Sequence, residues 1–292
     1  MNEIVKYDNR MNLLKFKGMT KVDLNIFMTL CSRMKDKGEE IIEITFEEIK
    51  KLSKYTSTDK ADFLKALDDM IQRLQKVNSK IITNDEICYF VLFPTFKVNP
   101  KTEIVKIGVN KDFIFLLNEL KAFTRFELAE FVELDSKYTK NLYRLLKQFR
   151  TTGKFIIDDI ADFREKLDCP IKYTQKYFYD DVLKPAVKEL QDKEVFKNLV
   201  CEPVKAKKRG APVIGYTFTF EPEQVHKAIK QVEQQEEPKK ETKQATKTTN
   251  KQVKAMTKSA ENYLNYSQRQ YSEEEIEDLE SKLLALSVQQ NN

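Results

Sequence analysis

The sequence of 292 residues has little histidine and little glycine: one histidine, His226, and six glycines. A single histidine argues against histidine metal sites, against Ser-His-Asp or Cys-His catalytic groups, and against nicking chemistry that uses a histidine-held metal. Neither a GxxxxGK nor a GxGxxG phosphate-binding motif occurs. The acidic pairs Asp158–Asp159 and Asp180–Asp181 are explained more simply as helix-start and helix-surface residues than as metal ligands. These features predict a protein that is not an enzyme and needs no metal or cofactor.

Close cysteine pairs and long apolar runs are also missing. Cys31, Cys88, Cys169 and Cys201 lie far apart in the chain, which excludes a CxxC zinc or redox motif and favours reduced thiols. The first ten residues lack the apolar core of a signal peptide. No stretch approaches the roughly 18 apolar residues of a membrane span. We therefore expect a soluble protein of the cytoplasm.

Charge is abundant but nearly balanced. Charged residues make up 33% of the chain, and the formal net charge is +5. Such a balance is only a weak indication of a polyanionic partner, so the position of the charges matters more than their sum.

The first 120 residues predict the element order of a winged helix. Apolar residues four apart predict a helix over 21–36, and a short strand follows over 39–45. Thr45, followed by Glu48, fits a capping box before a short helix over 46–55. A long amphipathic helix over 59–77 and two apolar strands over 80–98 and 103–109 complete the unit. The apolar stretch 87–93 is long enough to pair with a second copy, so we expect this half to be an assembly domain with accessory contacts to the DNA backbone.

The second half repeats this order. We expect a long helix over 123–149, a strand over 153–158 and a helix over 159–169 that starts at Asp158 or Asp159. Thr174 is a candidate N-cap for a helix over 173–191, which Pro185 should kink or divide. A hairpin over 196–221 follows. The fold class expected is therefore α+β, with two tandem winged-helix domains at 1–120 and 121–222.

The remaining residues have a different composition. Residues 223–271 are rich in Gln, Lys, Glu and Thr, which is typical of a disordered linker. Residues 272–287 have apolar residues on one helical face, which fits either a partner-docking helix or a solvated one.

Three groups of cationic and polar residues are candidates for DNA contact. The first is an acid-free stretch that places several cations within about 80° on a helical wheel, and its members are Lys137, Lys140, Arg144, Lys147, Arg150 and Lys154. The second surrounds the start of the predicted recognition helix and comprises Lys172, Thr174, Gln175, Lys176, Tyr177 and Lys184. The third is the hairpin tip, with Lys205, Lys207, Lys208 and Arg209. Each group has the alternative of an ordinary solvated surface, and Asp180 and Asp181 oppose binding unless they read a base or point away. Tyr216, Phe218 and Phe220 alternate on the return strand and are expected to pack inward rather than stack on bases.

Three segments of the second half resemble the iteron-binding, theta-type plasmid replication initiators, known as Rep proteins. The helix motif falls on Ser136, Tyr138, Thr139, Leu142, Tyr143, Leu145, Leu146 and Lys147. An LxPAxxEL pattern falls on Leu183, Pro185, Ala186, Glu189 and Leu190, and a basic wing runs into an aromatic strand over 207–220. The resemblance covers about residues 1–221 and is more specific in the second half.

The resemblance implies a function. Monomers of such initiators bind direct repeats, called iterons, at a plasmid origin, help to open an adjacent AT-rich segment, and recruit the host initiator and helicase. Dimers formed through the first winged helix act as autorepressors at the initiator's own promoter. The main alternative is a winged-helix transcriptional regulator without a replication role, which would share the same physical features. A scaffold that uses its winged helices to bind proteins is a further alternative.

Overall fold

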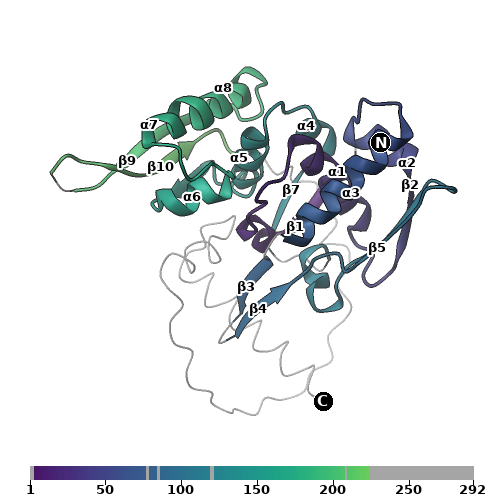
Figure 1. The fold of residues 1–292 in the computed structure, drawn as a ribbon. Helices are drawn as coiled ribbons and strands as arrows, with labels where there is room; N and C mark the ends of the chain where they lie inside the picture. Colours follow the sequence, from purple (N-terminus) through teal and green to yellow (C-terminus); the bar gives the residue numbers. More distant parts are fainter. Residues whose placement is uncertain (1–2, 77–78, 84–85, 119–121, 208, 224–292) are drawn as a thin grey trace, which may run out of the picture. The chain divides into compact units, whose positions relative to one another are not determined.

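The first half of the chain folds into helices and short antiparallel strands in the order expected of a winged helix. The computed structural model describes residues 3–76, 79–83, 86–118, 122–207 and 209–223 (Figure 1). The elements of the first half are β1 (Ile4–Asp8), η1 (Asn9–Leu13), α1 (Lys21–Met34), β2 (Ile42–Thr45), α2 (Phe46–Ser53), α3 (Lys60–Lys76), β3 (Ser79–Thr83), β4 (Glu86–Phe90), β5 (Thr95–Asn99), β6 (Ile104–Gly108) and η2 (Lys111–Leu116).

Helices α1 and α2 each begin after a threonine whose side chain caps the helix. The Thr20 hydroxyl accepts the Asp23 amide hydrogen and the Asp23 carboxylate accepts the Thr20 amide hydrogen, which is a complete capping box at the start of α1. Thr45 caps α2 as expected, by accepting from the Glu48 amide at 3.1 Å. The Glu48 carboxylate, however, accepts from Arg33 on α1, so the structure bears out Thr45 as the cap and gives Glu48 a tertiary contact.

The expected continuous strand over 80–98 is wrong, because this stretch contains three separate strands, β3, β4 and β5. β3 pairs with β4, while β5 pairs with β6, which in turn pairs with β2. Leu92 and Phe93, between β4 and β5, are both buried and anchor the break in the core. The stretch 87–93 therefore comprises the last four residues of β4 and part of the link to β5, in which Leu92 and Phe93 are buried, rather than one long strand.

The second half contains the second winged helix. Its elements are β7 (Phe123–Glu127), α4 (Leu128–Val132), α5 (Lys137–Lys147), β8 (Lys154–Ile157), α6 (Ile160–Lys166), α7 (Gln175–Tyr177), η3 (Phe178–Leu183), α8 (Lys184–Asp192), β9 (Val200–Lys205) and β10 (Val213–Thr219). β10 lies between β8 and β9 in an antiparallel sheet. Asp159 caps α6 and Thr174 caps α7, both as predicted. The strand, the helices and the hairpin that we expected over 153–221 are confirmed.

The long helix expected over 123–149 is wrong. Residues 123–127 form β7, in which buried Thr124 and Phe126 alternate with more exposed residues, and this strand pairs with β1 near the start of the sequence. The short helix α4 follows at Leu128–Val132, and α5 begins only after Ser136, whose hydroxyl accepts from the Tyr138 amide. The strand partner of 123–127 lies more than 100 residues away in the sequence, so local periodicity does not identify it.

Pro185 divides its helix, as predicted. The six residues Phe178–Leu183 adopt a π-helix, and a regular helix resumes at Lys184 with Pro185 in its first turn. Proline has no amide hydrogen to donate to the preceding turn, and a π-type insertion is one of the ways a helix accommodates that loss. The segment from Gln175 to Asp192 is thus one irregular helix, which we call the recognition helix.

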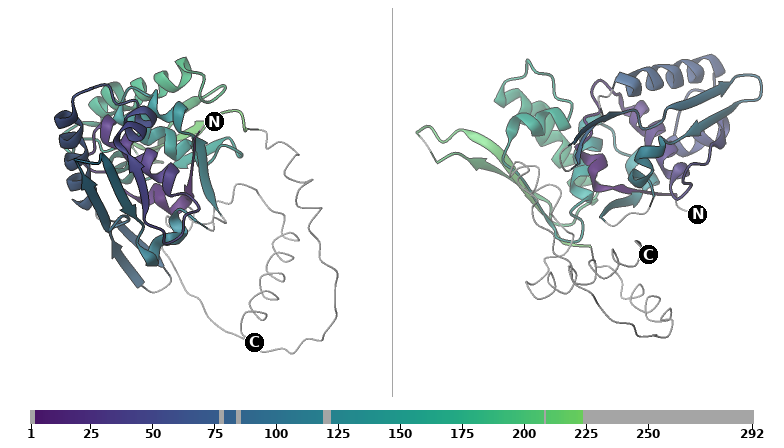
Figure 2. Two further views of the ribbon diagram at one scale, coloured as in Figure 1. Left: turned by 90° about the vertical axis from the view of Figure 1, so that its right-hand side faces the viewer. Right: turned by 90° about the horizontal axis from the view of Figure 1, so that it is seen from below.

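The hairpin of β9 and β10 with its connecting residues, which we call the wing, extends away from the helices of its domain (Figure 2). Tyr216, Phe218 and Phe220 are all buried, so the prediction that they pack inward is confirmed. Phe218 contacts Phe155 and Phe163, which ties the wing's return strand to β8 and α6.

The structure therefore contains two winged-helix domains in an α+β fold, as the sequence predicted. The exact domain limits at 120 and 222 stay a prediction. The expected linker over 223–271 and helix over 272–287 lie outside the described residues, apart from Glu223. Within the described ranges, no helix is both long enough and apolar enough to cross a membrane.

Candidate nucleic-acid interface

The cationic stripe predicted on α5 is not a surface stripe. Lys140 and Arg144 are completely buried, and Lys147 is 5% exposed. Helix α5 packs against α8, α1 and β7 together, so most of its circumference faces protein. The prediction that these three cations face solvent and phosphate is wrong, because the helical wheel does not show how many neighbours surround the helix.

Arg144 instead joins α5 to the N-terminal segment. Its guanidinium donates to the carbonyl oxygens of Met11 at 3.3 Å and Leu14 at 2.8 Å, and to the Asn12 side-chain oxygen at 3.3 Å. It also lies over the Phe16 ring at 4.7 Å from the centroid. The planar fork of donors in arginine suits such a set of converging acceptors. Arg144 therefore holds residues 11–16 against α5.

Lys140 serves as a C-terminal cap for α4. Its ammonium donates to the carbonyl oxygens of Phe131 at 2.6 Å and Val132 at 3.3 Å, and lies 4.6 Å from the centre of the Phe131 ring. A cation at a helix C-terminus satisfies carbonyls that have no partner within the helix. Burial, and to a smaller extent the nearby positive charge of Lys21, lower the pKa of Lys140 to about 7 against the opposing effect of Glu189 and Asp135.

Because of the lowered pKa of Lys140, we expect the free energy of unfolding to increase as the pH rises from 6.5 to 8.5. Below pH 7 both states carry the proton, so the full cost of burying the charge applies. Above pH 7 the folded state releases the proton while the unfolded state, with an ordinary lysine pKa, keeps it, and stability increases by about 2 kcal/mol over this window. The measurement is urea unfolding at several pH values for the wild type and for Lys140→Met, which should lack this increase. A pH dependence that is the same in both proteins would contradict the assignment.

Lys147 and two of the other cations of the predicted stripe form salt bridges with acidic side chains. Lys147 contacts Glu223 at 2.9 Å and Glu130 at 3.3 Å, while Arg150 contacts Glu223 at 3.3 Å. Lys137 donates to Asp168 at 2.6 Å. Of the six, Lys154 on β8 is the one that lies exposed with no salt bridge among the described residues. The stripe is thus largely an internal structural network.

The candidate residues around the recognition helix, in contrast, mostly lie on the surface. Lys172, Thr174, Lys176, Tyr177 and Lys184 are all exposed. The Thr174 hydroxyl accepts from the Tyr177 amide at 3.3 Å, so it serves as the helix cap. The buried face of the same helix is formed by Phe178, Val182, Ala186 and Leu190. The helix therefore presents an apolar face to the core and its basic N-terminal end to solvent.

Gln175 is positioned by the wing. Its side-chain amide donates to the Tyr216 hydroxyl at 3.0 Å, and the Tyr179 ring stacks on Tyr216 at an interplanar angle of 8°. Burial raises the pKa of Tyr216 to about 12, so its hydroxyl stays neutral. Gln175 is half-buried, and its hydrogen bond to Tyr216 holds the side chain in one orientation. Sequence patterns do not show this preorganisation.

The wing tip carries the second exposed cationic cluster. Lys205, Lys207 and Arg209 are exposed, and Lys208 lies outside the described residues. The tip is closed by the Ala206 amide, which donates to the Pro212 oxygen at 2.9 Å, and by Gly210 at φ +82°. Among the described residues, none of these three cations has a salt bridge. Two basic surfaces, the start of the recognition helix and the wing tip, therefore belong to the same domain.

Asp180 and Asp181 are exposed on the recognition helix, beyond its basic first turn. They follow the cap by six and seven residues, so the basic end of the helix is free of acidic neighbours in its first turn. The acidic pair therefore separates the basic N-terminal end of the helix from Lys184 and favours the N-terminal end as the main part of the candidate interface.

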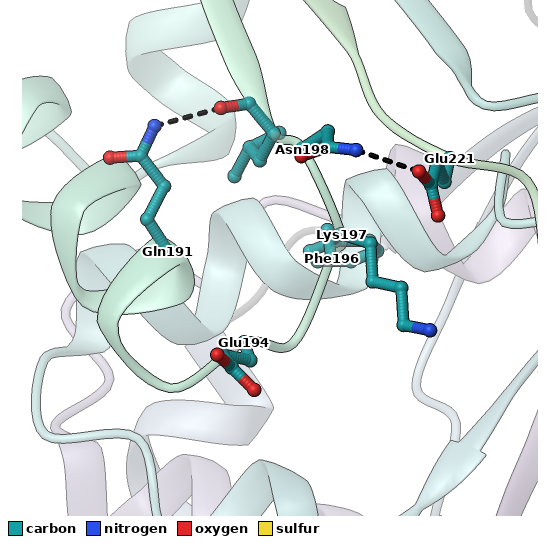
Figure 3. Close-up of a pocket in the computed structure, with 7 residues that line it drawn as sticks. Gln191, Glu194, Phe196, Lys197, Asn198 and Glu221 are labelled. Carbon is teal, nitrogen blue, oxygen red and sulfur yellow. Dashed lines mark hydrogen bonds between the residues drawn. The ribbon is translucent and has the colours of Figure 1, made fainter.

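A surface pocket of about 460 Å³ lies at the opposite end of the same helix (Figure 3). Its polar side chains bind one another and the backbone: Gln191 donates to the Leu199 carbonyl at 2.7 Å and Asn198 donates to Glu221 at 2.6 Å. These bonds hold the connection from α8 to β9 and the end of β10. The pocket is better explained by that structural role than by a small ligand.

The described part of the chain contains no cluster of three or more His, Cys, Asp or Glu side chains arranged to hold a metal. Cys31, Cys169 and Cys201 are free thiols, and burial raises the pKa of each. They are therefore protonated and unreactive at neutral pH.

Comparison with known proteins decides the family. Residues 4–147 match the family described as "Initiator Replication protein, WH1", and residues 159–220 match "Initiator Rep protein, WH2". The chain belongs to the Rep family of replication initiators. A "Probable replication protein rep" from Bifidobacterium longum (strain NCC 2705) is 34% identical over 235 residues, which cover 76% of this chain and 74% of that protein. The family membership favours a replication protein over a transcriptional regulator alone.

A solved structure shares the fold. The crystal structure of the Pi initiator protein in complex with iteron DNA superposes with a TM-score of 0.57 and 17% sequence identity, covering 75% of this chain and 97% of that chain. At this level of identity the similarity establishes the tandem winged-helix fold of the Rep protein described here.

Proposed function

We propose that this Rep protein is a plasmid replication initiator that binds double-stranded DNA through the N-terminal end of the recognition helix and the wing tip. The proposal rests on a difference in solvent exposure among the cations of the second domain. Those on α5 are buried or paired, whereas those at Lys172, Lys176, Lys205, Lys207 and Arg209 are exposed. Exposed cations at the start of a helix and on an adjoining hairpin fit the helix in the major groove and the wing on the flanking backbone or minor groove.

The DNA would be recognised by two kinds of contact. Lysines and Arg209 neutralise phosphates and position the protein, without reading sequence. Gln175, fixed by Tyr216, and Lys176 have the donors and acceptors that suit adenine and guanine edges. Lys154 and Lys184 lie exposed in the same domain and extend the phosphate contacts.

The resemblance to iteron-binding initiators supports the finer aspects of this proposal. We propose that the duplex sites are iterons at a plasmid origin, that binding promotes opening of the origin, and that host initiator and helicase proteins are recruited. Dimers formed through the first winged helix would repress the protein's own promoter, and that domain would add contacts to the DNA backbone. The protein would act in the cytoplasm by binding alone, without a catalytic step.

Removing the wing cations should weaken binding in a salt-dependent way. Each phosphate contact contributes a slope of about −0.9 to log K against log [salt], so the variant Lys205→Ala/Lys207→Ala/Arg209→Ala should have a slope smaller by about 2.7. Between 50 and 200 mM salt, the wild type should therefore lose about 40-fold more affinity than the variant. Affinity is measured by fluorescence anisotropy on the direct-repeat DNA that footprinting identifies near the gene.

The control is a variant with the same change in net charge, Lys51→Ala/Lys65→Ala/Lys97→Ala, on exposed sites of the first domain. Its slope should change by less than that of the wing variant. Equal slopes for both variants would show that only net charge matters and would contradict the wing as a contact. Absence of any protected duplex in the footprint would contradict the proposed function itself.

A further inference from the structure

We infer that Ile171 and Tyr177 form an apolar surface that reads thymine methyl groups in the bound DNA site. This inference rests on the proposed function and adds to it the base that the protein distinguishes. Ile171 lies on the turn directly before the recognition helix, and Tyr177 lies in the first turn of that helix, so both flank the N-cap residue Thr174.

Ile171 is 89% exposed, the highest value among the exposed large hydrophobic side chains of the described chain. Its exposure is enforced by the local structure. The Tyr173 amide donates to the Pro170 oxygen at 3.0 Å, which closes a tight turn around Ile171, and the Arg164 guanidinium binds the Tyr173 carbonyl. The isoleucine is therefore held outward on a fixed turn.

Tyr177 is 58% exposed, although the next residue of the helix, Phe178, is completely buried. The Tyr177 ring lies 6.2 Å from that of Tyr173, which is half-buried and thus supports it from one side. Tyr173 and Tyr177 therefore lie together at the end of the helix that the proposed function places in the major groove, and exposed Ile171 lies on the turn just before them.

The surrounding charge identifies the partner. Exposed Lys172 directly follows Ile171 and exposed Lys176 directly precedes Tyr177, so the apolar side chains lie next to cations that attract phosphates. In the major groove, the C5-methyl of thymine is the apolar group on the base edges, and apolar side chains contact it.

The test removes the methyl group from the DNA and the side chain from the protein. Duplexes bound by the wild type are selected from a random library, and each thymine in the consensus is replaced in turn by uracil, which lacks only the methyl. At one or two positions, uracil should weaken wild-type binding about fourfold, as expected for loss of one buried methyl. Ile171→Ala should bind the thymine duplex at least fourfold more weakly and should show no further loss with uracil at one of those positions.

The matched control is Ile41→Ala, which removes an exposed isoleucine from the first domain and should keep the full response to uracil. Equal thermal unfolding of Ile171→Ala and wild type verifies that the fold is intact. A loss on uracil substitution that is the same in Ile171→Ala and wild type at every position, or no loss in either, would overturn the inference and leave the proposed function standing. Failure of the wild type to select any duplex would overturn both.

Discussion

Replacing Arg144 with alanine is expected to lower the free energy of unfolding by about 3–5 kcal/mol, because a buried charged donor that holds several acceptors is removed. The carbonyl oxygens of Met11 and Leu14 and the side-chain oxygen of Asn12 would each lose a hydrogen bond in a site with little access to water. Such acceptors cost about 1–3 kcal/mol each when left unsatisfied in the interior.

The effect should spread through the buried polar network to which Asn12 belongs. The Asn12 amide donates to Thr124 on β7 at 2.8 Å and to Gln148 at 3.0 Å, while Tyr7 on β1 donates to the Asn12 oxygen at 3.0 Å. Losing Arg144 therefore weakens the attachment of the N-terminal segment to both the β1–β7 pair and α5.

The control for this prediction is Arg125→Ala, at an exposed arginine on β7. A surface substitution of this kind should change stability by less than about 0.5 kcal/mol. Urea unfolding measures both variants, and DNA affinity is measured where each is folded. If Arg144→Ala were as stable as Arg125→Ala yet bound DNA much more weakly, Arg144 would be a phosphate contact as its sequence position first indicated.

The second large effect is expected for Gly215→Ala, in the return strand of the wing. A Cβ at this position would lie 1.8 Å from the Ile157 carbonyl oxygen and 2.7 Å from the Asp158 Cα, both of them backbone atoms that cannot rotate away. The pairing of β10 with β9 is already irregular between Val213 and Gly215. The methyl group would force β10 away from β8, and we expect a loss of about 3 kcal/mol or more, at the upper end for overpacking.

Gly108→Ala is the matched control, because Gly108 is also a buried strand glycine. Its Cβ would meet the Ile41 side chain at 3.3 Å, a contact that a small side-chain movement relieves. We expect a change of less than about 1 kcal/mol. Calorimetric melting compares the two variants, and equal destabilisation would show that the close approach of β8 and β10 is not what requires glycine at 215.

Much of the second domain could be predicted from the sequence because its signals are local. Asp159 and Thr174 are N-caps, Pro185 interrupts a helix, and alternating aromatics mark the return strand of the wing. Each of these signals acts within a few residues, and so does the structure it specifies. A glycine inside a strand pattern was also a usable signal for the close approach at Gly215.

The candidate site could be predicted only in part. The exposed cations around Thr174 and at the wing tip lie where their sequence positions indicated. Lys140, Arg144 and Lys147 do not, because a basic face on a helix is a surface only if nothing packs against it. The acceptors that bind Arg144 come from residues 11–14, about 130 positions away in the chain, and no spacing within α5 indicates them.

The sequence by itself determined the two winged helices and the elements over 153–221, since caps, periodicity and turn residues act over short distances. The tertiary structure alone decided which cations are free to meet DNA. Burial depends on the packing of distant segments: β1 against β7, the N-terminal residues against α5, and Glu223 against Lys147 and Arg150. Charge is a property of the residue, but its availability to a ligand is a property of the fold.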